Sequence, residues 1–274
     1  MNPSVRNLHF DLEGVPRHWH GGRRSVTAFL DGLSVFFPAG ERFFVSSVRA
    51  HQDCVRDPTL AQQVRAFCGQ EGVHSREHAR YNAHLAAQGF PVDELEARVK
   101  TLLDGVTRRA PALNQLAVTC ALEHFTALMG HMLLGDSRLL EGADPKMAAL
   151  WRWHAAEENE HKTVAFDVYR AAGGGYLRRA VVMIGATIIF WTKVYEHQVA
   201  MMRADGIDRS WDEWRALGRF LFIDPGGMGR LLRPYLQYFR PSFHPSDIDT
   251  EALLDDWKHE FDASPAYAET RAAS

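Results

Sequence analysis

The sequence predicts an all-α protein, and three observations support that fold class. Apolar residues recur with a period near 3.6 over most long segments, as in helices that bury one face. Alternation with a period of two, bounded by tight turns, is not sustained anywhere, so no sheet is expected. Helix-start signals precede the long segments, for example Asp57-Pro58 and Asp144-Pro145.

The first two thirds of the chain are expected to form an arm followed by long helices. Residues 1–33 are predicted to be an N-terminal arm that carries one short helix at 25–33. The long helices are expected at 38–55, 58–88, 112–134 and from 145 to the glycine run at 173–175, with a charged helix at 92–103 between the second and third. Residues 34–172 would then form a bundle built on four long helices.

The remaining residues, 173–274, are predicted to be a helical extension that packs on the bundle as part of a single domain. An apolar helix is expected at 176–204, and Ser210-Trp-Asp-Glu213 has the pattern of a capping box. The proline- and aromatic-rich stretch at 224–249 should be an ordered wrap, followed by a last helix at 250–261 and a frayed tail.

The composition is that of an ordinary globular chain with one unusual feature. Its 274 residues are 46% hydrophobic and 24% charged, which excludes disordered and collagen-like classes. The net charge of −3 argues against a nucleic-acid partner. The unusual feature is the 14 histidines, several of which lie beside glutamates at helical spacing.

Three further patterns predict a cytoplasmic location. The cysteines Cys54, Cys68 and Cys120 are far apart and form no C-x-x-C pair, which indicates free thiols in a reducing compartment. The N-terminal segment lacks a charged stretch followed by an apolar run, so we expect no secretory leader. The most apolar stretch, Ala180–Trp191, is too short to span a bilayer; a buried helix or peripheral membrane contact is expected there.

Metal-ligand side chains lie in the middle of two apolar helix faces. One face of the helix at 58–88 is apolar at both ends and carries Glu71, His74 and His78 between them. The helix from 145 repeats this pattern with Glu158 and His161. An unpaired buried carboxylate costs several kcal/mol, and a bound divalent metal removes that cost.

Two more glutamates complete an ordered set. Glu41 and Glu123 each lie alone on an apolar face of another predicted helix. Two Glu-x-x-His helices and a single glutamate from each of two others are the ligand set of di-iron or di-manganese carboxylate bundles. The expected ligands are therefore Glu41, Glu71, His74, Glu123, Glu158 and His161. The alternatives are solvated acids and hydrogen-bonded core histidines, which the apolar neighbours on the same faces disfavour.

Five segments resemble the all-helical family labelled "predicted metal-dependent hydrolase". They are FPAGERFF (37–44), QEGVHSREH (70–78), LEHF (122–125), WHAAEENEH (153–161) and YFRPSFHPSDID (238–249). The resemblance implies a ferritin-like fold with a metal centre. The hydrolase label is itself a prediction, and nothing in these residues requires hydrolysis.

A narrower resemblance adds one ligand. His154-x-x-x-Glu158-x-x-His161 is similar to the motif of the di-iron arylamine N-oxygenases, in which the extra histidine is a third imidazole ligand. The likeness implies that His154 binds metal here as well, and residues four and seven positions apart do share a helix face. Three further residues on or near these faces are expected to surround the ligands or line a pocket: His78, Tyr81 and Trp151.

The function expected from this set is O₂ activation by a non-haem di-iron enzyme that oxidises or oxygenates a small, partly apolar organic substrate. Two iron ions are expected, with manganese or a mixed pair as alternatives, and an electron donor is required. A di-metal hydrolase with a metal-bridged water remains the rival, and ferritin-like iron oxidation or storage is a third possibility. A homodimer is also compatible with the sequence.

Overall fold

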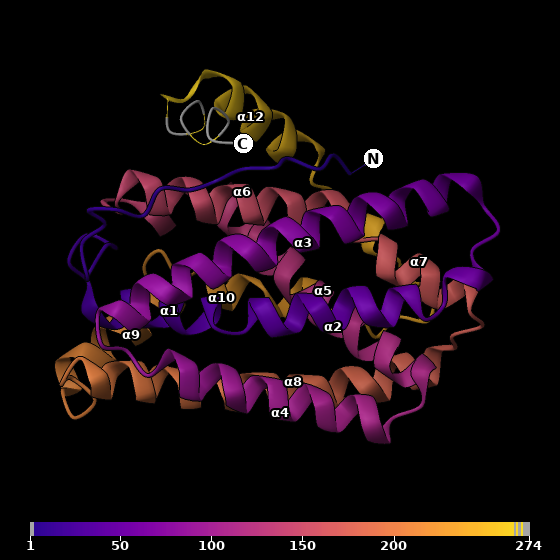
Figure 1. The fold of residues 1–274 in the computed structure, drawn as a ribbon, viewed down its shortest axis with the longest axis horizontal. Coiled ribbons are helices and arrows are strands. Elements are labelled where there is room, and N and C mark those ends of the chain that lie inside the picture. Colours follow the sequence, from indigo (N-terminus) through magenta and orange to yellow (C-terminus); the bar gives the residue numbers. More distant parts are fainter. Residues whose placement is uncertain (1–2, 266, 268–269, 271–274) are drawn as a thin grey trace.

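The computed structural model describes residues 3–265 together with 267 and 270. Within those residues the only β-type pairing is an isolated bridge between His20 and Ala143, and every other regular element is helical. The predicted all-α class is therefore confirmed (Figure 1).

The helices lie close to their predicted positions. Their bounds are α1 Arg24–Ser34, α2 Phe37–Arg49, α3 Pro58–Ala87, α4 Val92–Arg109, α5 Ala112–Gly135, α6 Pro145–His161, α7 Val164–Ala171, α8 Tyr176–Ala204, α9 Trp211–Phe222, α10 Gly227–Arg230, α11 Leu232–Gln237 and α12 Glu251–Ala263. Short 3₁₀ turns occur at Gln52–Cys54, Ser137–Leu140 and Pro245–Asp247.

The predicted helix starts are made by side-chain caps. Asp57 accepts a hydrogen bond from the Thr59 amide at 2.9 Å, and Asp144 accepts one from the Lys146 amide at 2.9 Å. Ser210 caps α9 through the Glu213 amide at 3.3 Å. The Glu213 carboxylate, however, accepts from the Ser25 amide at 3.1 Å, so only half of the predicted capping box forms.

Three sequence predictions of element boundaries were wrong. The helix that starts near Pro38 ends at Arg49 rather than at residue 55, and a 3₁₀ turn follows it. The helix from 145 is two helices, because the chain breaks at Lys162, whose ammonium donates to the Ile248 carbonyl and, at 2.9 Å, to Thr250 Oγ1. The charged helix predicted at 92–103 continues to Arg109, and it ends where Pro111 favours an extended backbone at Ala110. The predicted wrap at 224–249 contains two short helices, α10 and α11.

The sequence predicts a frayed tail after the last helix, but part of that tail packs on α6. Tyr267 is buried and donates a hydrogen bond to the Ala149 carbonyl on α6 at 2.9 Å. Trp257 of α12 donates to the Tyr267 hydroxyl at 3.3 Å. Residues 266, 268–269 and 271–274 of the predicted tail lie outside the described residues.

Four helices enclose the centre of the molecule. Helix α2 packs on α3, α5 packs on α6, and contacts between α2 and α5 and between α3 and α6 complete the set. Helices α4 and α8 lie outside this group, against α2 and α5 respectively, at the lower edge of Figure 1. By length and composition α5 could cross a membrane, but 67% of its most apolar window is buried inside the protein.

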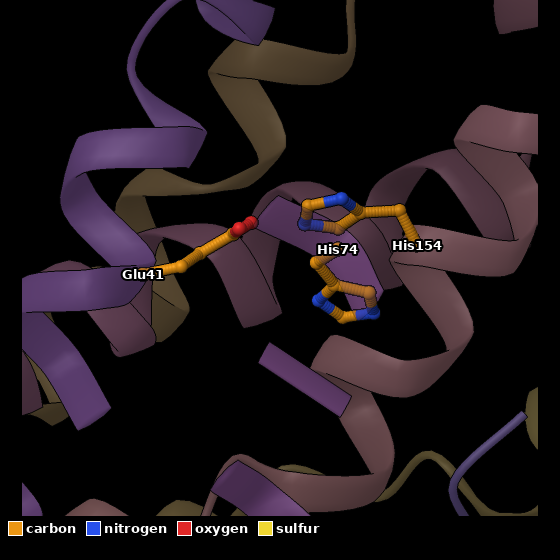
Figure 2. Close-up of side chains that lie close together, drawn as sticks. All are labelled: Glu41, His74 and His154. Atoms are coloured by element: carbon orange, nitrogen blue, oxygen red, sulfur yellow. The ribbon is translucent and has the colours of Figure 1, made fainter. Parts of the chain in front are cut away.

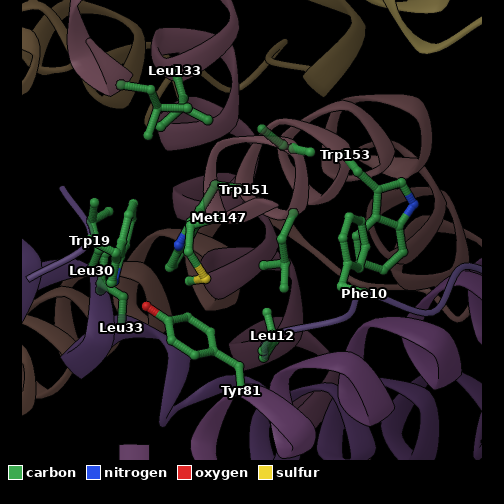
Figure 3. Packing of buried hydrophobic residues seen from close by; sticks show 14 of the residues in the cluster. Phe10, Leu12, Trp19, Leu30, Leu33, Tyr81, Leu133, Met147, Trp151 and Trp153 are labelled. Carbon is green, nitrogen blue, oxygen red and sulfur yellow. The ribbon is translucent and has the colours of Figure 1, made fainter. Parts of the chain in front are cut away.

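The N-terminal arm belongs to the core. Phe10 packs on Trp153 of α6 with ring centroids 5.3 Å apart, and Leu12 and Trp19 are buried in the same cluster (Figure 3). In Figure 1 the arm runs along α6 beneath α12. The arm therefore closes one side of the helices that carry the predicted ligands.

Candidate metal centre

All seven predicted ligands meet in the centre of the four enclosed helices. Helix α2 supplies one of them, α3 two, α5 one and α6 three, and each of the seven is at most 3% exposed. The potential ligand atoms fall into three groups, within each of which they lie no more than 4.8 Å apart: Glu41 with His74 and His154, Glu71 with Glu123 and His161, and Glu71 with His74 and Glu158. Figure 2 shows the first group.

The distances divide the centre into two adjacent subsites. In one, His161 Nε2 lies 3.4 Å from Glu71 Oε1 and 3.4 Å from Glu123 Oε2. In the other, Glu41 faces the imidazoles of His74 and His154, which stack with centroids 4.3 Å apart.

Two carboxylates lie between the subsites. Glu158 approaches His74 Nδ1 at 3.6 Å with one oxygen and His161 Nε2 at 3.6 Å with the other. Glu71 likewise approaches His161 with Oε1 and His74, at 3.9 Å, with Oε2. Each of these carboxylates therefore directs one oxygen toward each subsite.

The atoms that face the centre have no hydrogen-bond partner. These buried, unpaired atoms are both carboxylate oxygens of Glu41, Glu71 and Glu123, Glu158 Oε2, His74 Nδ1, His154 Nε2 and His161 Nε2. Buried polar groups without partners are rare in folded proteins, and a cluster of acceptors and lone pairs is the donor set that a metal ion satisfies. The residues present therefore fit a divalent metal ion.

The other ring nitrogen of each histidine is held by a fixed partner. His74 Nε2 donates to Glu157 Oε2 at 3.0 Å, and His161 Nδ1 donates to Gln70 Oε1 at 3.0 Å. Such outer hydrogen bonds orient a ligating imidazole and set its tautomer. Here they direct His74 Nδ1 and His161 Nε2 at the carboxylates, where these atoms can bind a metal ion.

A hydrogen-bonded chain sets the tautomer of His154 in the same way. The Ser34 hydroxyl donates to Asn82 Oδ1 at 2.8 Å, so it accepts from His78 Nδ1 at 2.9 Å. The other nitrogen of neutral His78 then accepts from His154 Nδ1 at 2.7 Å. His154 Nε2 is thereby left with a lone pair, and the chain continues from Asn82 Nδ2 to Glu96 Oε1 at 2.7 Å.

Burial and mutual repulsion of the acids perturb the titration of the centre. Burial, reinforced by neighbouring carboxylates, raises the pKa of Glu71 well above its usual value and raises the pKa of Glu123 to about 8. Burial lowers the pKa of His154 to about 4. Burial opposes protonation of His74 too, but the adjacent carboxylates of Glu157 and Glu158 raise its pKa to about 10. Without a cation, the cluster must hold protons instead.

Comparison with known proteins identifies the family. The family model described as "Predicted metal-dependent hydrolase" matches residues 4–249. The chain belongs to this family. The match includes the arm and every helix that supplies a ligand, which confirms the resemblance found in the sequence. No curated protein and no solved structure matches the chain.

The three residues predicted to surround the ligands, His78, Trp151 and Tyr81, lie at different distances from the ligand His154. His78 contacts His154 directly, as described above. Trp151 lies with its ring centroid 6.4 Å from that of His154 and lines a cavity next to it. Tyr81 is one ring further away: its hydroxyl donates to buried Asp31, and its centroid is 6.1 Å from that of His78.

Two apolar cavities adjoin the centre of this member of the predicted metal-dependent hydrolase family. The larger, of about 350 Å³, has Glu41 in its wall. The smaller, of about 70 Å³, is lined by His154 and Glu158. Both cavities share four lining residues: Leu33, Phe37, Thr126 and Met129.

Residues outside the predicted ligand set form hydrogen bonds that orient the ligands. Glu157 and Gln70 directly precede the ligands Glu158 and Glu71, and this adjacency to a ligand is the signal by which they could have been found. Arg6 donates to Glu157 Oε1 at 2.9 Å and to Glu160 Oε1 at 2.7 Å. No local pattern in the sequence marks Arg6, because its partners are about 150 residues away.

Proposed function

We propose that the chain is a ferritin-like di-metal enzyme that activates O₂ to oxidise or oxygenate a small, partly apolar organic substrate. The observation that carries the proposal is the order of the ligands: Glu41 on α2, Glu71 and His74 on α3, Glu123 on α5, and Glu158 and His161 on α6. This order, one glutamate from each of two helices and a Glu-x-x-His from each of two others, is that of di-iron carboxylate bundles.

The donor chemistry favours two iron ions, with manganese or a mixed pair as alternatives. Three neutral imidazoles join four carboxylates, and imidazole nitrogen suits iron, whereas magnesium and calcium prefer oxygen alone. When bound, such a pair supplies the electrons that reduce O₂. The chain's own part is to hold the ligands in place through Glu157, Gln70 and His78 and to exclude water with an apolar surround.

The apolar cavities support an oxidation rather than a hydrolysis. The walls next to Glu41, His154 and Glu158 are almost entirely hydrocarbon, so they would accept O₂ and an apolar substrate and keep bulk water out. The proposal also requires an electron donor that returns the metals to the reduced state. Binding of an electron donor and formation of a homodimer remain predictions from the sequence.

One observation favours a second candidate, the hydrolase of the family's label. A surface groove between α2 and α3 has Glu41 and Glu71 in its wall, together with Arg42, Arg49 and Arg76. Water could reach the metals from this side, and the arginines would attract an anionic substrate. In that case a metal-activated water would be the nucleophile.

An oxygen-consumption experiment separates the two candidates. Protein loaded with Fe(II) under anaerobic conditions is mixed with O₂ and followed by stopped-flow absorbance and an oxygen electrode. We expect O₂ uptake and a transient visible absorption band. The Glu123→Gln variant, which lacks one charged ligand, should lose the band.

The opposite outcome would favour the hydrolase. If Fe(II) protein takes up no O₂ while Zn²⁺ protein hydrolyses model esters or amides, the proposed oxidation is wrong. The Glu94→Gln variant is a control for both assays, because Glu94 is an exposed residue of α4 that pairs with Arg98 outside the metal centre.

A further inference from the structure

The larger cavity is an elongated apolar channel between α2, α4, α5 and α8. Its lining residues on α5 extend from Asn114 to Met129, which corresponds to about 22 Å at the rise of an α-helix. The volume is about 350 Å³. The polar members of the lining are Glu41, Asn114, Thr126 and Lys193, and all the others are apolar residues or glycine.

A missing side chain on α8 gives the channel part of its width. Gly185 lines the channel, and a Cβ placed on it would meet no heavy atom within 4 Å. A glycine inside a helix costs about 1 kcal/mol relative to alanine and is not needed here for backbone geometry. Its presence leaves space that a larger residue would fill.

The channel opens between α4 and α8. Ile189 lines the channel and is 46% exposed, so it lies at the mouth. Lys193 lies one helical turn further along α8 and is also in the lining. The outer face of α8 next to this mouth is apolar, because Ile184 and Ile188 are more than half exposed.

The mouth is the one place in the channel lining with a positive charge. Lys193 Nζ pairs with Glu196 Oε2 at 2.7 Å, and the two side chains are 31% and 37% exposed. Ion pairs at such exposure are weak, so the ammonium can also bind an incoming carboxylate. An apolar channel past Glu41 with an ammonium at its mouth is complementary to an amphiphile with an anionic head.

We infer that the channel binds a medium-length, unbranched fatty acid, with its hydrocarbon chain along α5 past Glu41 and its carboxylate at Lys193. The inference names the substrate class of the proposed metal centre and, as a substrate assignment, rests on the proposed function. Binding itself requires neither metal nor O₂, which allows the two to be tested separately.

The test measures dodecanoate binding to the metal-free full-length protein by titration calorimetry. Gly185→Leu places a side chain in the channel and should weaken binding by about tenfold or more, because the ligand then loses its space. The matched control is Gly218→Leu on α9, where a Cβ also meets nothing within 4 Å but no channel is present. Its affinity should equal that of the unmodified protein.

Two further variants test the wall and the head group. Val118→Phe fills the channel from α5 and should act as Gly185→Leu does, which also covers the case that Gly185→Leu fails to fold. Lys193→Met should weaken dodecanoate by about tenfold and leave dodecanol unchanged, since only the acid uses the ammonium.

Absence of dodecanoate binding would overturn the inference. Binding by Gly185→Leu and Val118→Phe that is as tight as binding by the unmodified protein would also overturn it, because the ligand would then lie on the exposed face of α8 rather than in the channel. If Lys193→Met loses the same affinity for dodecanoate as for dodecanol, the placement of the carboxylate at Lys193 is wrong. Channel binding without O₂-dependent oxidation would leave the site intact and refute the proposed function instead.

Discussion

Each histidine of the metal centre directs one ring nitrogen toward the carboxylates and keeps the other on a fixed partner. For His74 that partner is Glu157, which Arg6 holds in turn. We therefore expect Glu157→Gln to lower metal affinity by about 10- to 100-fold with no loss of fold. Metal titration with a competing chelator measures this, with the exposed Glu94→Gln on α4 as a control. Unchanged affinity would show that Glu157 does not orient His74.

Buried Asp31 gives the fold a pH dependence that is separate from the metals. It accepts hydrogen bonds from Trp19 at 2.9 Å and from Tyr81, yet burial raises its pKa to about 7. An acid with a raised folded pKa stabilises the fold fully below its unfolded pKa, about 3.9, and this contribution is lost as pH rises through the folded value.

Asp31→Asn keeps the acceptor oxygen and removes the ionisation. The variant should be more stable than the unmodified protein by about 4 kcal/mol at pH 8, and by only about 1.5 kcal/mol at pH 5. Urea unfolding of metal-free protein at the two pH values measures the difference. A difference that does not change with pH would refute this role of Asp31.

At the level of helices, the contact between α5 and α6 depends on Gly130. A Cβ at this position would lie 2.8 Å from the Ala155 carbonyl oxygen and 2.8 Å from Asn159 Nδ2. Gly130→Ala should therefore force the helices apart, destabilise the protein by about 2 kcal/mol and weaken metal binding through Glu123. Gly185→Ala, which faces open space, is the control and should be neutral or slightly stabilising. Equal stability of the two variants in chemical unfolding would contradict this expectation.

Helix periodicity predicted most of the elements and the ligand helices because burial of one helix face is a local property of the sequence. The stripes that carry Glu71 and Glu158 could be recognised without a structure for that reason. The break at Lys162 and the anchoring by Arg6 depend on partners that are distant in the chain, at Ile248 and Glu157, and local patterns contain no information on them. The same holds for the channel, which exists only where α4 and α8 meet α5.

For the molecule as a whole, the buried acids predict a strong coupling between metal content and stability. Burial raises the pKa of Glu41 and Glu71 well above their usual values, so the metal-free fold loses stability as pH rises. Metal binding removes this penalty. Chelation should lower Tm by about 10 °C at pH 8 and by less at pH 5.5, as measured by calorimetry. Recovery of Tm on return of Fe(II) is the control, and a Tm that chelation leaves unchanged would refute the coupling.

The link between Arg6 and Glu157 also has a consequence for biosynthesis. The arm leaves the ribosome first, but its partners on α6 are synthesised about 150 residues later. A nascent chain that ends before His161 lacks at least one of the donors. A metal ion therefore cannot be held by the complete set of ligands until synthesis has passed α6.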